Sequence, residues 1–201
     1  MIESLSRIES QRSLNPIAVP IDDFVADLTQ LAHAAVEPAT ELNLSVEVPE
    51  PRLMFGPGFA QDAILNLVLN AAEAQESAAK IDIVMARTTD AMFEVTVTDN
   101  GPGFSDDALA NALAPFYSTK SGKVGRGLGL STAFDFAKSS GGTLRLRNSA
   151  SGGAQVHLRI PYTPARAAAA GLVLLVDDTL DVRQTVRSYL RRAGHAVVEA
   201  A

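Results

Sequence analysis

The sequence predicts an α+β fold, in which helices cover one face of a single sheet, followed by the start of a second, α/β domain. Two pairs of strand-like segments with alternating apolar residues occur at 80–99 and 143–161. Apolar stripes with helical spacing precede and separate these pairs. The chain ends in a β-α-β pattern at 172–200.

The N-terminal elements follow from spacing and from prolines. Residues 1–12 have apolar residues every third position, which suits a short helical tail. The next segment is expected to be extended because Pro16 and Pro20 disfavour helix for the residues before them. A helix is expected to begin at the acidic pair 22–23 and to end near Pro38 or a few residues later. Residues 44–48 alternate as a strand, and prolines and glycines at 49–58 indicate a connection.

The central elements lead into a long loop. Nothing breaks a helix between 60 and 79, and strands follow at 80–88 and 92–99. Residues 101–126 form a loop long enough to be a functional lid. A helix is expected at 131–139, ended by a glycine pair. A hairpin then joins 143–149 to 154–161 around Ser151-Gly152-Gly153.

The C-terminal part reads as a linker and an incomplete domain. Residues 163–171 are Ala-rich and are interpreted as a tether, with helix or linker left open. A buried-strand pattern at 172–176, a helix after Asp177 and Asp178, and a strand at 195–200 follow. This β-α-β unit is expected to be too small to fold alone.

Composition excludes several function classes. The net charge of −6 and the pI near 5.0 argue against a nucleic-acid footprint, which needs a clustered basic face. The absence of cysteine excludes disulfides and Cys-based zinc sites. Apolar runs such as 172–176 are too short to cross a bilayer, so we expect no membrane contact by this segment.

Asn66 and Asn70 lie four residues apart in NLVLNAAEA, so their amides share one face of the predicted helix. An amide oxygen can bind a hard cation such as Mg²⁺. A surface polar stripe explains the pair about equally well when it is taken alone. Burying two amides in an otherwise apolar helix is costly without partners, which favours a site.

Two glycine-rich segments follow a carboxylate. Asp99 ends a strand and precedes Asn-Gly-Pro-Gly, so it could accept a hydrogen bond from an adenine amine. Gly103 would let the backbone approach the ring. Gly125, Gly127 and Gly129 could offer backbone amides and a helix N-terminus to phosphates. Each segment alone is also explained by an ordinary turn or flexible loop.

Taken together, NLVLNAAEA, DNGPGF, APFYSTK and GRGLGLS resemble the four nucleotide-binding boxes of the catalytic domain of sensor histidine kinases. The resemblance covers about residues 20–162 and implies the two-layer, mixed-sheet (Bergerat-type) fold shared with gyrase-type, heat-shock-chaperone and mismatch-repair ATPases. It assigns residues 1–19 to the end of a dimerisation helix and its linker. It also implies ATP and Mg²⁺ as ligands.

The resemblance implies these roles position by position. Asn70 matches the Mg²⁺ ligand, Asn66 its partner near the phosphates, and Asp99 the adenine-reading acid. The remaining matches are the glycines of the adenine end and the residues of the lid, namely Gly101, Gly103, Phe116, Lys120, Gly125, Gly127, Leu128 and Gly129. Lys120 could contact the terminal phosphate.

One position favours a kinase over an ATPase. The hydrolysing members of the fold carry a glutamate one turn before the metal asparagine, and here that residue is Asn66. Residues 172–201 resemble the start of a response-regulator receiver, with Asp177 and Asp178 as its Mg²⁺-binding acids. An acidic helix N-terminus explains these acids as well. The receiver's acceptor aspartate would lie beyond residue 201.

The histidines are interpreted as structural. His33 has the His-to-Pro spacing of a phosphoacceptor box but lacks the acid after it, so it is expected to belong to the first catalytic-domain helix. His157 and His195 fall in or beside strands. The expected protein is a cytoplasmic hybrid histidine kinase segment, whose parent could be membrane-anchored. Its partners would be a histidine-bearing dimerisation domain and a receiver, and an ATPase or a degenerate nucleotide-binding scaffold is the alternative.

Overall fold

The computed structural model describes residues 16–75, 79–111, 129–165, 171–192 and 195–200. The chain divides into two compact units, with the boundary after Pro164. The first unit holds a five-stranded sheet and three main helices, and the second holds a two-stranded sheet and one helix.

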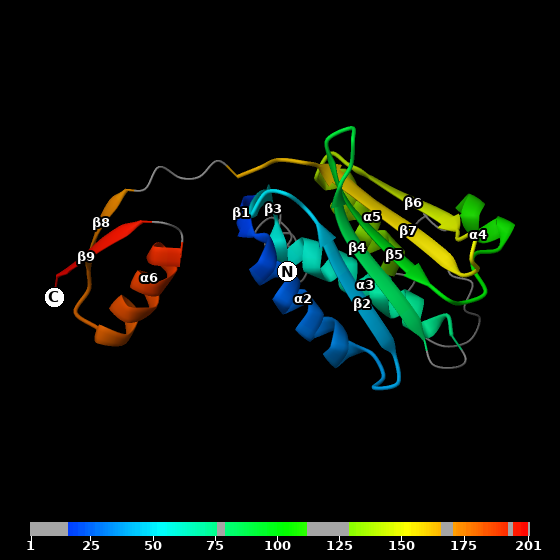
Figure 1. The fold of residues 1–201 in the computed structure, drawn as a ribbon, viewed down its shortest axis with the longest axis horizontal. Coiled ribbons are helices and arrows are strands. Elements are labelled where there is room, and N and C mark those ends of the chain that lie inside the picture. The colour runs from blue at the N-terminus through cyan, green and yellow to red at the C-terminus, as the bar shows by residue number, and fades with distance from the viewer. Residues whose placement is uncertain (1–15, 76–78, 112–128, 166–170, 193–194, 201) are drawn as a thin grey trace, which may run out of the picture. The chain divides into compact units, whose positions relative to one another are not determined.

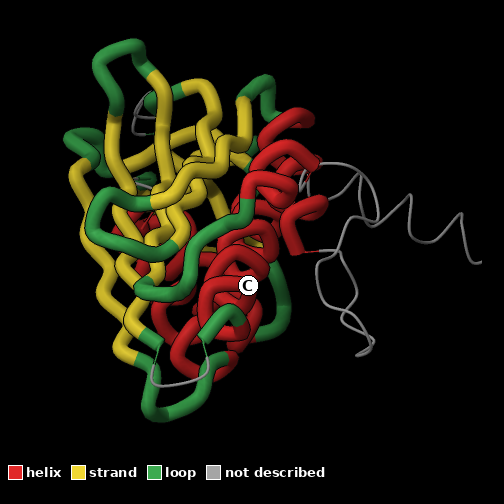
Figure 2. The backbone as a smooth tube through the Cα atoms, turned by 90° about the vertical axis from the view of Figure 1, so that its right-hand side faces the viewer, coloured by secondary structure: helices red, strands yellow, loops and turns green. Residues whose placement is uncertain are grey.

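The five-stranded sheet has the order β2-β4-β5-β7-β6. Only the β2–β4 pair is parallel, so the sheet is mixed, as the resemblance implied. The strands form one layer and the helices the other (Figures 1 and 2). The strands are β2 (Glu41–Glu47), β4 (Lys80–Arg87), β5 (Met92–Asp99), β6 (Thr143–Asn148) and β7 (Ala154–Pro161).

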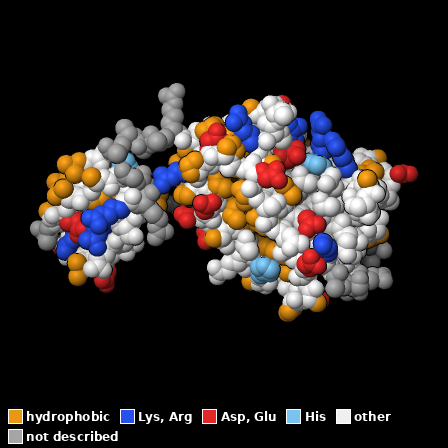
Figure 3. Space-filling model, in the orientation of Figure 1, with side chains coloured by type: hydrophobic (Ala, Val, Ile, Leu, Met, Phe, Trp, Pro, Cys, Tyr) orange, Lys and Arg blue, Asp and Glu red, His pale blue; other side chains and the backbone are white. Residues whose placement is uncertain are grey.

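Alternation along the central strands decides which side chains face the helices. In β4, β5 and β7 every second residue is buried. The buried row of β5 begins at Phe93 and ends at Asp99, so a carboxylate occupies the last core-facing position of that strand. The opposite face of the sheet carries interspersed acidic, basic and histidine side chains (Figure 3).

Three helices cover the inner face of the sheet. They are α2 (Ile21–Ala35), α3 (Pro57–Glu73) and α5 (Gly129–Ser139). Asp22 and Asp23 lie in the first turn of α2, where negative charge favours the helix dipole. Pro57 is the first residue of α3, where its missing N–H costs nothing. The buried residues of α3 repeat at helical spacing and pack on the sheet.

The prediction for 60–79 was wrong at both ends of that helix. The helix begins three residues earlier, because Pro57 starts it rather than ending a connection. It ends at Glu73, since the chain must turn back to enter β4 at Lys80. Ala79 is buried outside the helix, and its carbonyl accepts a hydrogen bond from Glu41 N.

Three short elements were not predicted as strands or helices. β1 (Ile17–Pro20) pairs antiparallel with β3 (Arg52–Phe55), so part of the expected connection at 49–58 is a strand. Each strand is only four residues long, and neither carries a clear alternating pattern. A short helix, α4 (Asp106–Asn111), lies within the segment expected to be a loop.

The second unit is the predicted β-α-β pattern. β8 (Leu172–Val176) and β9 (Ala196–Ala200) are parallel and are joined by α6 (Leu180–Arg192). An ion pair of 2.9 Å between Arg187 and Glu199 ties the helix to β9. Large apolar side chains of this unit are exposed, including Leu172, Leu174, Val176 and Tyr189.

Among the described helices, none has the length and apolar content that a membrane crossing requires.

Candidate functional site

Asp99 is a buried carboxylate at the end of β5. It is 8% exposed and is the one polar or charged side chain classed as buried in the described part of the chain. A charge in such a position is costly unless it is hydrogen-bonded. Gly101 N donates to Asp99 Oδ1 at 2.8 Å, and Ala154 N donates to the same oxygen at 3.0 Å. Both of these backbone donors bind Oδ1. The other oxygen, Oδ2, is therefore the one that would accept a hydrogen bond from a ligand.

The loop after Asp99 needs its glycines for space and for conformation. A Cβ on Gly101 would lie 2.7 Å from Gln75 Nε2 and 2.9 Å from Asp99 Oδ1. Gly103 has a φ of +77°, which glycine adopts without strain. A side chain at Gly101 would therefore collide with groups beside the carboxylate, and one at Gly103 would meet Asn148 Oδ1 at 2.8 Å.

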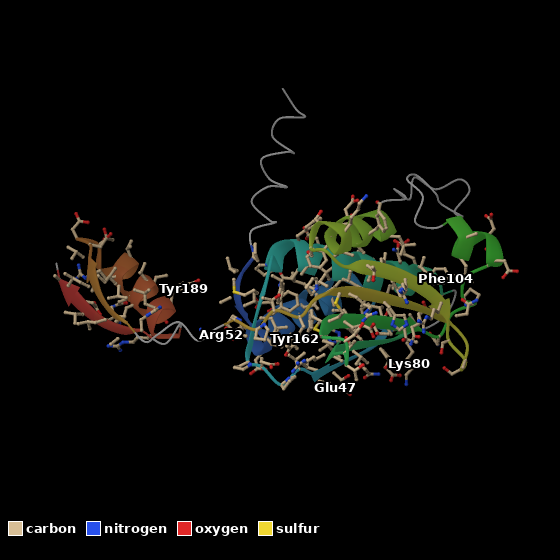
Figure 4. All side chains as sticks on the ribbon, turned by 90° about the horizontal axis from the view of Figure 1, so that it is seen from above. Glu47, Arg52, Lys80, Phe104, Tyr162 and Tyr189 are labelled. Atoms are coloured by element: carbon tan, nitrogen blue, oxygen red, sulfur yellow. The ribbon has the colours of Figure 1, made fainter. Side chains whose placement is uncertain are left out.

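The β6–β7 hairpin holds this loop in place. Asn148 Oδ1 accepts a hydrogen bond from Phe104 N at 2.7 Å, and Asn148 Nδ2 donates to Phe104 O at 2.9 Å. Gly153 lies against the backbone of Asp99, where a Cβ would come within 1.8 Å of the Asp99 carbonyl oxygen. On the other side, Asn100 Oδ1 accepts a hydrogen bond from Lys80 N at 2.8 Å. Phe104 and Lys80 lie toward one end of the first unit, and Tyr162 and Arg52 lie toward the other (Figure 4).

Asn66 and Asn70 lie on one edge of α3, and both are half-buried. Asn66 Nδ2 donates to the carbonyl oxygen of Asp62, one turn earlier, at 2.8 Å. Phe59 is on the same edge, seven and eleven residues before the two amides. Its ring meets Phe136 of α5 edge-on, with 5.3 Å between ring centroids. The amide edge of α3 is therefore the edge that faces α5.

The same contact orients α5. Phe59 is in the first turn of α3 and Phe136 is in the second half of α5, and the two helices pack along each other. They must run antiparallel, because a parallel pair would overlap only at its ends. The N-terminus of α5 at Gly129 thus lies beside the half of α3 that carries Asn66 and Asn70. The structure brings these amides and Gly129 to the same side of the molecule.

Five other predicted site residues lie outside the described residues: Phe116, Lys120, Gly125, Gly127 and Leu128. Their roles remain predictions.

Sequence reasoning missed the residues that position Asp99. Gln75, Asn148 and Gly153 all contact this region, yet none belongs to a pattern that marks nucleotide binding. The Gly152-Gly153 pair was interpreted only as a hairpin turn. The sequence does not show the strand register that brings Gly153 against the backbone of Asp99.

The remaining predicted residues occupy separate places. His33 is an exposed residue of α2, as expected. His157 lies in β7, 3.5 Å from Glu94 Oε1. Asp177 Oδ1 accepts a hydrogen bond from Thr179 N, and Asp178 Oδ1 accepts one from Thr179 Oγ1. The described residues hold no cluster of three or more His, Cys, Asp or Glu side chains suited to a metal ion.

The chain matches the family model described as histidine kinase-, DNA gyrase B- and HSP90-like ATPase over residues 57–164. It is 36% identical to the C4-dicarboxylate transport sensor protein DctB of Pseudomonas aeruginosa over 135 residues, which are 65% of this chain and 22% of that protein. It is 30% identical to the sensor protein FixL of Bradyrhizobium diazoefficiens over 159 residues, which are 78% of this chain and 30% of that protein. The chain thus spans less than a third of the length of these two relatives.

The fold of this chain is similar to that of solved histidine kinase structures. Full-length ShkA in complex with AMPPNP matches with a TM-score of 0.66 and 21% identity, covering 94% of this chain and 41% of that one. The catalytic domain of the histidine kinase ThkA in a nucleotide-free form matches with a TM-score of 0.63 and 23% identity, covering 75% of this chain and 98% of that one. The family match covers more than half of the chain and contains all the predicted nucleotide-binding residues. The chain belongs to the family of histidine kinase-, DNA gyrase B- and HSP90-like ATPases.

Proposed function

We propose that this chain is the catalytic part of a cytoplasmic hybrid sensor histidine kinase. It binds ATP with Mg²⁺ and transfers the γ-phosphoryl group to a histidine on a dimerisation domain, from which the group passes to a receiver aspartate. The observation that carries the choice of a kinase is the residue one turn before Asn70, which is the amide Asn66.

An amide cannot act as the general base that activates water, because it takes no proton near neutral pH. The side chain of Asn66 is also anchored, since its Nδ2 donates to the Asp62 carbonyl. Without a base at this place, bound ATP is protected from hydrolysis until an acceptor nucleophile arrives. Catalysis of phosphoryl transfer then depends on positioning and on neutralising charge.

The described residues form two ends of one site, of which one would bind the base of the nucleotide and the other its phosphates. Asp99 Oδ2 accepts a hydrogen bond from the base of the nucleotide, and the space beside Gly101 and Gly103 admits the ring. The amides of α3 and the N-terminus of α5 at Gly129 serve the phosphate end, where the helix dipole favours negative charge. The segment with Phe116, Lys120, Gly125, Gly127 and Leu128 would complete that end as a lid.

The α3 amides suit Mg²⁺ better than a transition metal. Mg²⁺ prefers oxygen ligands and is usually held by one or two protein groups together with substrate phosphates. The Asn70 oxygen supplies such a ligand on the edge that faces Gly129. When bound, the ion would neutralise charge on the transferred phosphoryl group.

We assign the second unit to a receiver, the kind of domain whose aspartate would accept the phosphoryl group. Its β-α-β order and the position of Asp177 and Asp178 directly after β8 support the assignment to a receiver. The two carboxylates would then contribute to the receiver's own Mg²⁺ site. The exposed apolar side chains of this unit are consistent with a sheet that needs further elements to cover it.

A phosphotransfer assay tests the proposal. The full chain is incubated with γ-labelled ATP and Mg²⁺, alone and with a separately produced dimerisation domain of the Pseudomonas aeruginosa C4-dicarboxylate sensor. Acid-labile label on the added domain, with none on this chain, is expected. Steady ATP turnover that Asn66→Ala leaves unchanged would instead show an ATPase. Failure to bind a fluorescent ATP analogue with Mg²⁺ would show a scaffold.

A further inference from the structure

One long side of strand β6 has no partner strand in the described part of the chain. β6 is the last strand in the order β2-β4-β5-β7-β6, and it pairs with β7 alone (Figure 1). In an antiparallel pair, every second residue directs its backbone N–H and C=O away from the neighbouring strand. Ser149 N donates to the Gly153 carbonyl, so the odd-numbered residues of β6 are the ones bonded to β7. Leu144 and Leu146 therefore direct their backbone groups outward, along the open side.

The outer face of β6 carries two arginines without an ionic partner. The side chains of Arg145 and Arg147 are exposed, and they share one face because they are two residues apart on a strand. Neither forms an ion pair with a described residue. Arg159 of β7, by contrast, is paired with Asp90 at 2.6 Å and with Glu94 at 3.2 Å. Those two acids of the outer face are thus already engaged.

These features select for an added strand with acidic residues at alternate positions. An open edge accepts another extended segment through backbone hydrogen bonds, and the side chains of that segment give specificity. Opposite charges directly across two strands stabilise the pair, whereas like charges destabilise it. Carboxylates two residues apart would therefore lie opposite Arg145 and Arg147. The residue between them would lie opposite Leu146, whose half-buried side chain favours an apolar neighbour.

Other occupants fit this edge less well. If β6 paired antiparallel with a second β6 in a register centred on Arg145 or Leu146, each Arg145 would face an arginine of the other copy. β2, the other edge strand, carries its acids only at its two ends, Glu41 and Glu47, and so cannot oppose both arginines. Two arginines in a chain with a net charge of −6 do not form the basic face that a nucleic acid requires.

We propose that β6 is a docking site for an extended acidic segment of a partner protein, which adds to the sheet as an antiparallel strand. Carboxylates at alternate positions of that segment pair with Arg145 and Arg147, and the residue between them packs against Leu146. The added strand ends before Asn148, whose side chain is bonded to the loop that follows Asp99. This surface is separate from the proposed nucleotide site, so the inference does not rest on the proposed function.

Fluorescence anisotropy of labelled peptides, titrated with the full chain, tests the docking. The probe is a short peptide of alternating glutamate and valine. A peptide of alternating lysine and valine, and one with the same glutamates and valines in two blocks, should each bind at least about tenfold more weakly. Arg145→Gln and Arg147→Gln should each weaken binding of the probe about threefold. Arg191→Gln removes the same charge from an exposed position of α6 and should leave binding unchanged.

Backbone methylation of the peptide separates strand addition from charge attraction. In antiparallel addition, the valines opposite Leu144 and Leu146 form the hydrogen bonds to β6, and the glutamates direct their N–H groups away. A peptide built with N-methylvaline should therefore lose binding, and one built with N-methylglutamate should keep it. Equal binding of the two methylated peptides, or of the alternating and block peptides, would reduce the contact to charge attraction and overturn the inference.

Sedimentation velocity of the chain without peptide examines a second copy as the occupant. We expect no association at the concentrations of the titration. Association that Arg145→Gln changes would identify a second copy on this edge and overturn the proposal. Failure of the alternating peptide to bind at about 1 mM chain would overturn it as well. None of these results depends on nucleotide, so each leaves the proposed function to its own assay.

Discussion

The side-chain amide of Asn148 makes two hydrogen bonds to the backbone of Phe104: Oδ1 accepts from Phe104 N at 2.7 Å, and Nδ2 donates to Phe104 O at 2.9 Å. The contact joins residues 44 positions apart in the sequence. Its two hydrogen bonds resemble the N–H and C=O pairing of neighbouring strands. It fixes the far end of the loop that begins at Asp99. The hairpin β6–β7 therefore positions the loop at the end of the site that is proposed to bind the base.

Replacing Asn148 by Ala should loosen this loop. Both hydrogen bonds are exposed, so the loss of stability should be small, about 1 kcal/mol. ATP affinity should fall by a larger factor than stability suggests, about three- to tenfold, because the loop must be ordered when the nucleotide binds. Chemical denaturation and calorimetric titration measure the two effects. Asn43→Ala removes exposed amide contacts in β2 and is the control; equal ATP affinity in both variants would contradict the prediction.

Substitution of Asp99 should separate recognition of the base from stability. Asp99→Asn keeps an oxygen for Gly101 N and Ala154 N, and it turns the other atom into a donor that opposes the donor of the base. We expect ATP affinity to fall by about 10- to 100-fold, the loss typical for a hydrogen bond to a charged group, while the fold is kept. Asp99→Ala should lose affinity as well and also about 1–3 kcal/mol of stability, because two buried donors lose their acceptor. Binding by Asp99→Asn at wild-type strength would disprove the role of the carboxylate.

Much of the architecture follows from patterns in the sequence. Alternation predicted β4, β5 and β7, and the same alternation places Asp99 in the buried row of its strand. The amide pair on α3 was predicted to share a face, and it does so because helical spacing alone fixes that relation. Local spacing is enough wherever the site residues belong to one element.

The parts that were missed depend on contacts between distant segments. β1 and β3 are four residues each, and they are strands only because they pair with each other. The contacts of Asn148 and Gly153 with the Asp99 loop depend on the register between β5 and β7, which no single segment encodes. The end of α3 at Glu73 is set by where the chain must enter β4, and nothing in the sequence around Ala74 marks it.

The glycine pair of the β6–β7 turn offers a matched test of the contact with Asp99. Gly152 and Gly153 both have positive φ, +93° and +86°, so alanine strains the backbone at either position by about 1–2 kcal/mol. Only at Gly153 would the new Cβ also collide with backbone, 1.8 Å from the Asp99 carbonyl oxygen. Gly153→Ala should therefore lose more than about 3 kcal/mol in urea denaturation, and Gly152→Ala only the strain. Similar losses in the two variants would show that the collision is relieved by a shift of the turn.

The ion pair between Asp90 and Arg159 gives a pH-dependent contribution on the outer face of the sheet. A hydrogen bond from Thr88 Oγ1, and then the guanidinium of Arg159, lower the pKa of the Asp90 carboxyl below 3.8. A lowered pKa in the folded state adds stability that is present above the unfolded pKa and is lost as the pH falls through the folded one. The difference in stability between wild type and Asp90→Asn should be constant above pH 5 and shrink below about pH 4. Denaturation series at several pH values measure it, and a difference that persists at pH 2 would contradict the assignment.

The amide edge of α3 predicts which part of nucleotide binding depends on the metal. Asn70→Ala removes the proposed Mg²⁺ ligand and leaves Asp99 and its loop untouched, so the affinity for ATP without Mg²⁺ should stay unchanged. The gain in affinity on adding Mg²⁺ should fall about tenfold, as expected for the loss of one metal-ligand contact. Phosphotransfer to the added dimerisation domain should fall further, since charge on the phosphoryl group is less well neutralised. Titrations of ATP with and without Mg²⁺ on wild type, Asn70→Ala and Asn43→Ala provide the comparison. If Mg²⁺ raised the ATP affinity of Asn70→Ala as much as that of the wild type, Asn70 would not be a ligand of the ion. The groups to test next would then be Asn66, one turn earlier, and the N-terminus of α5 at Gly129.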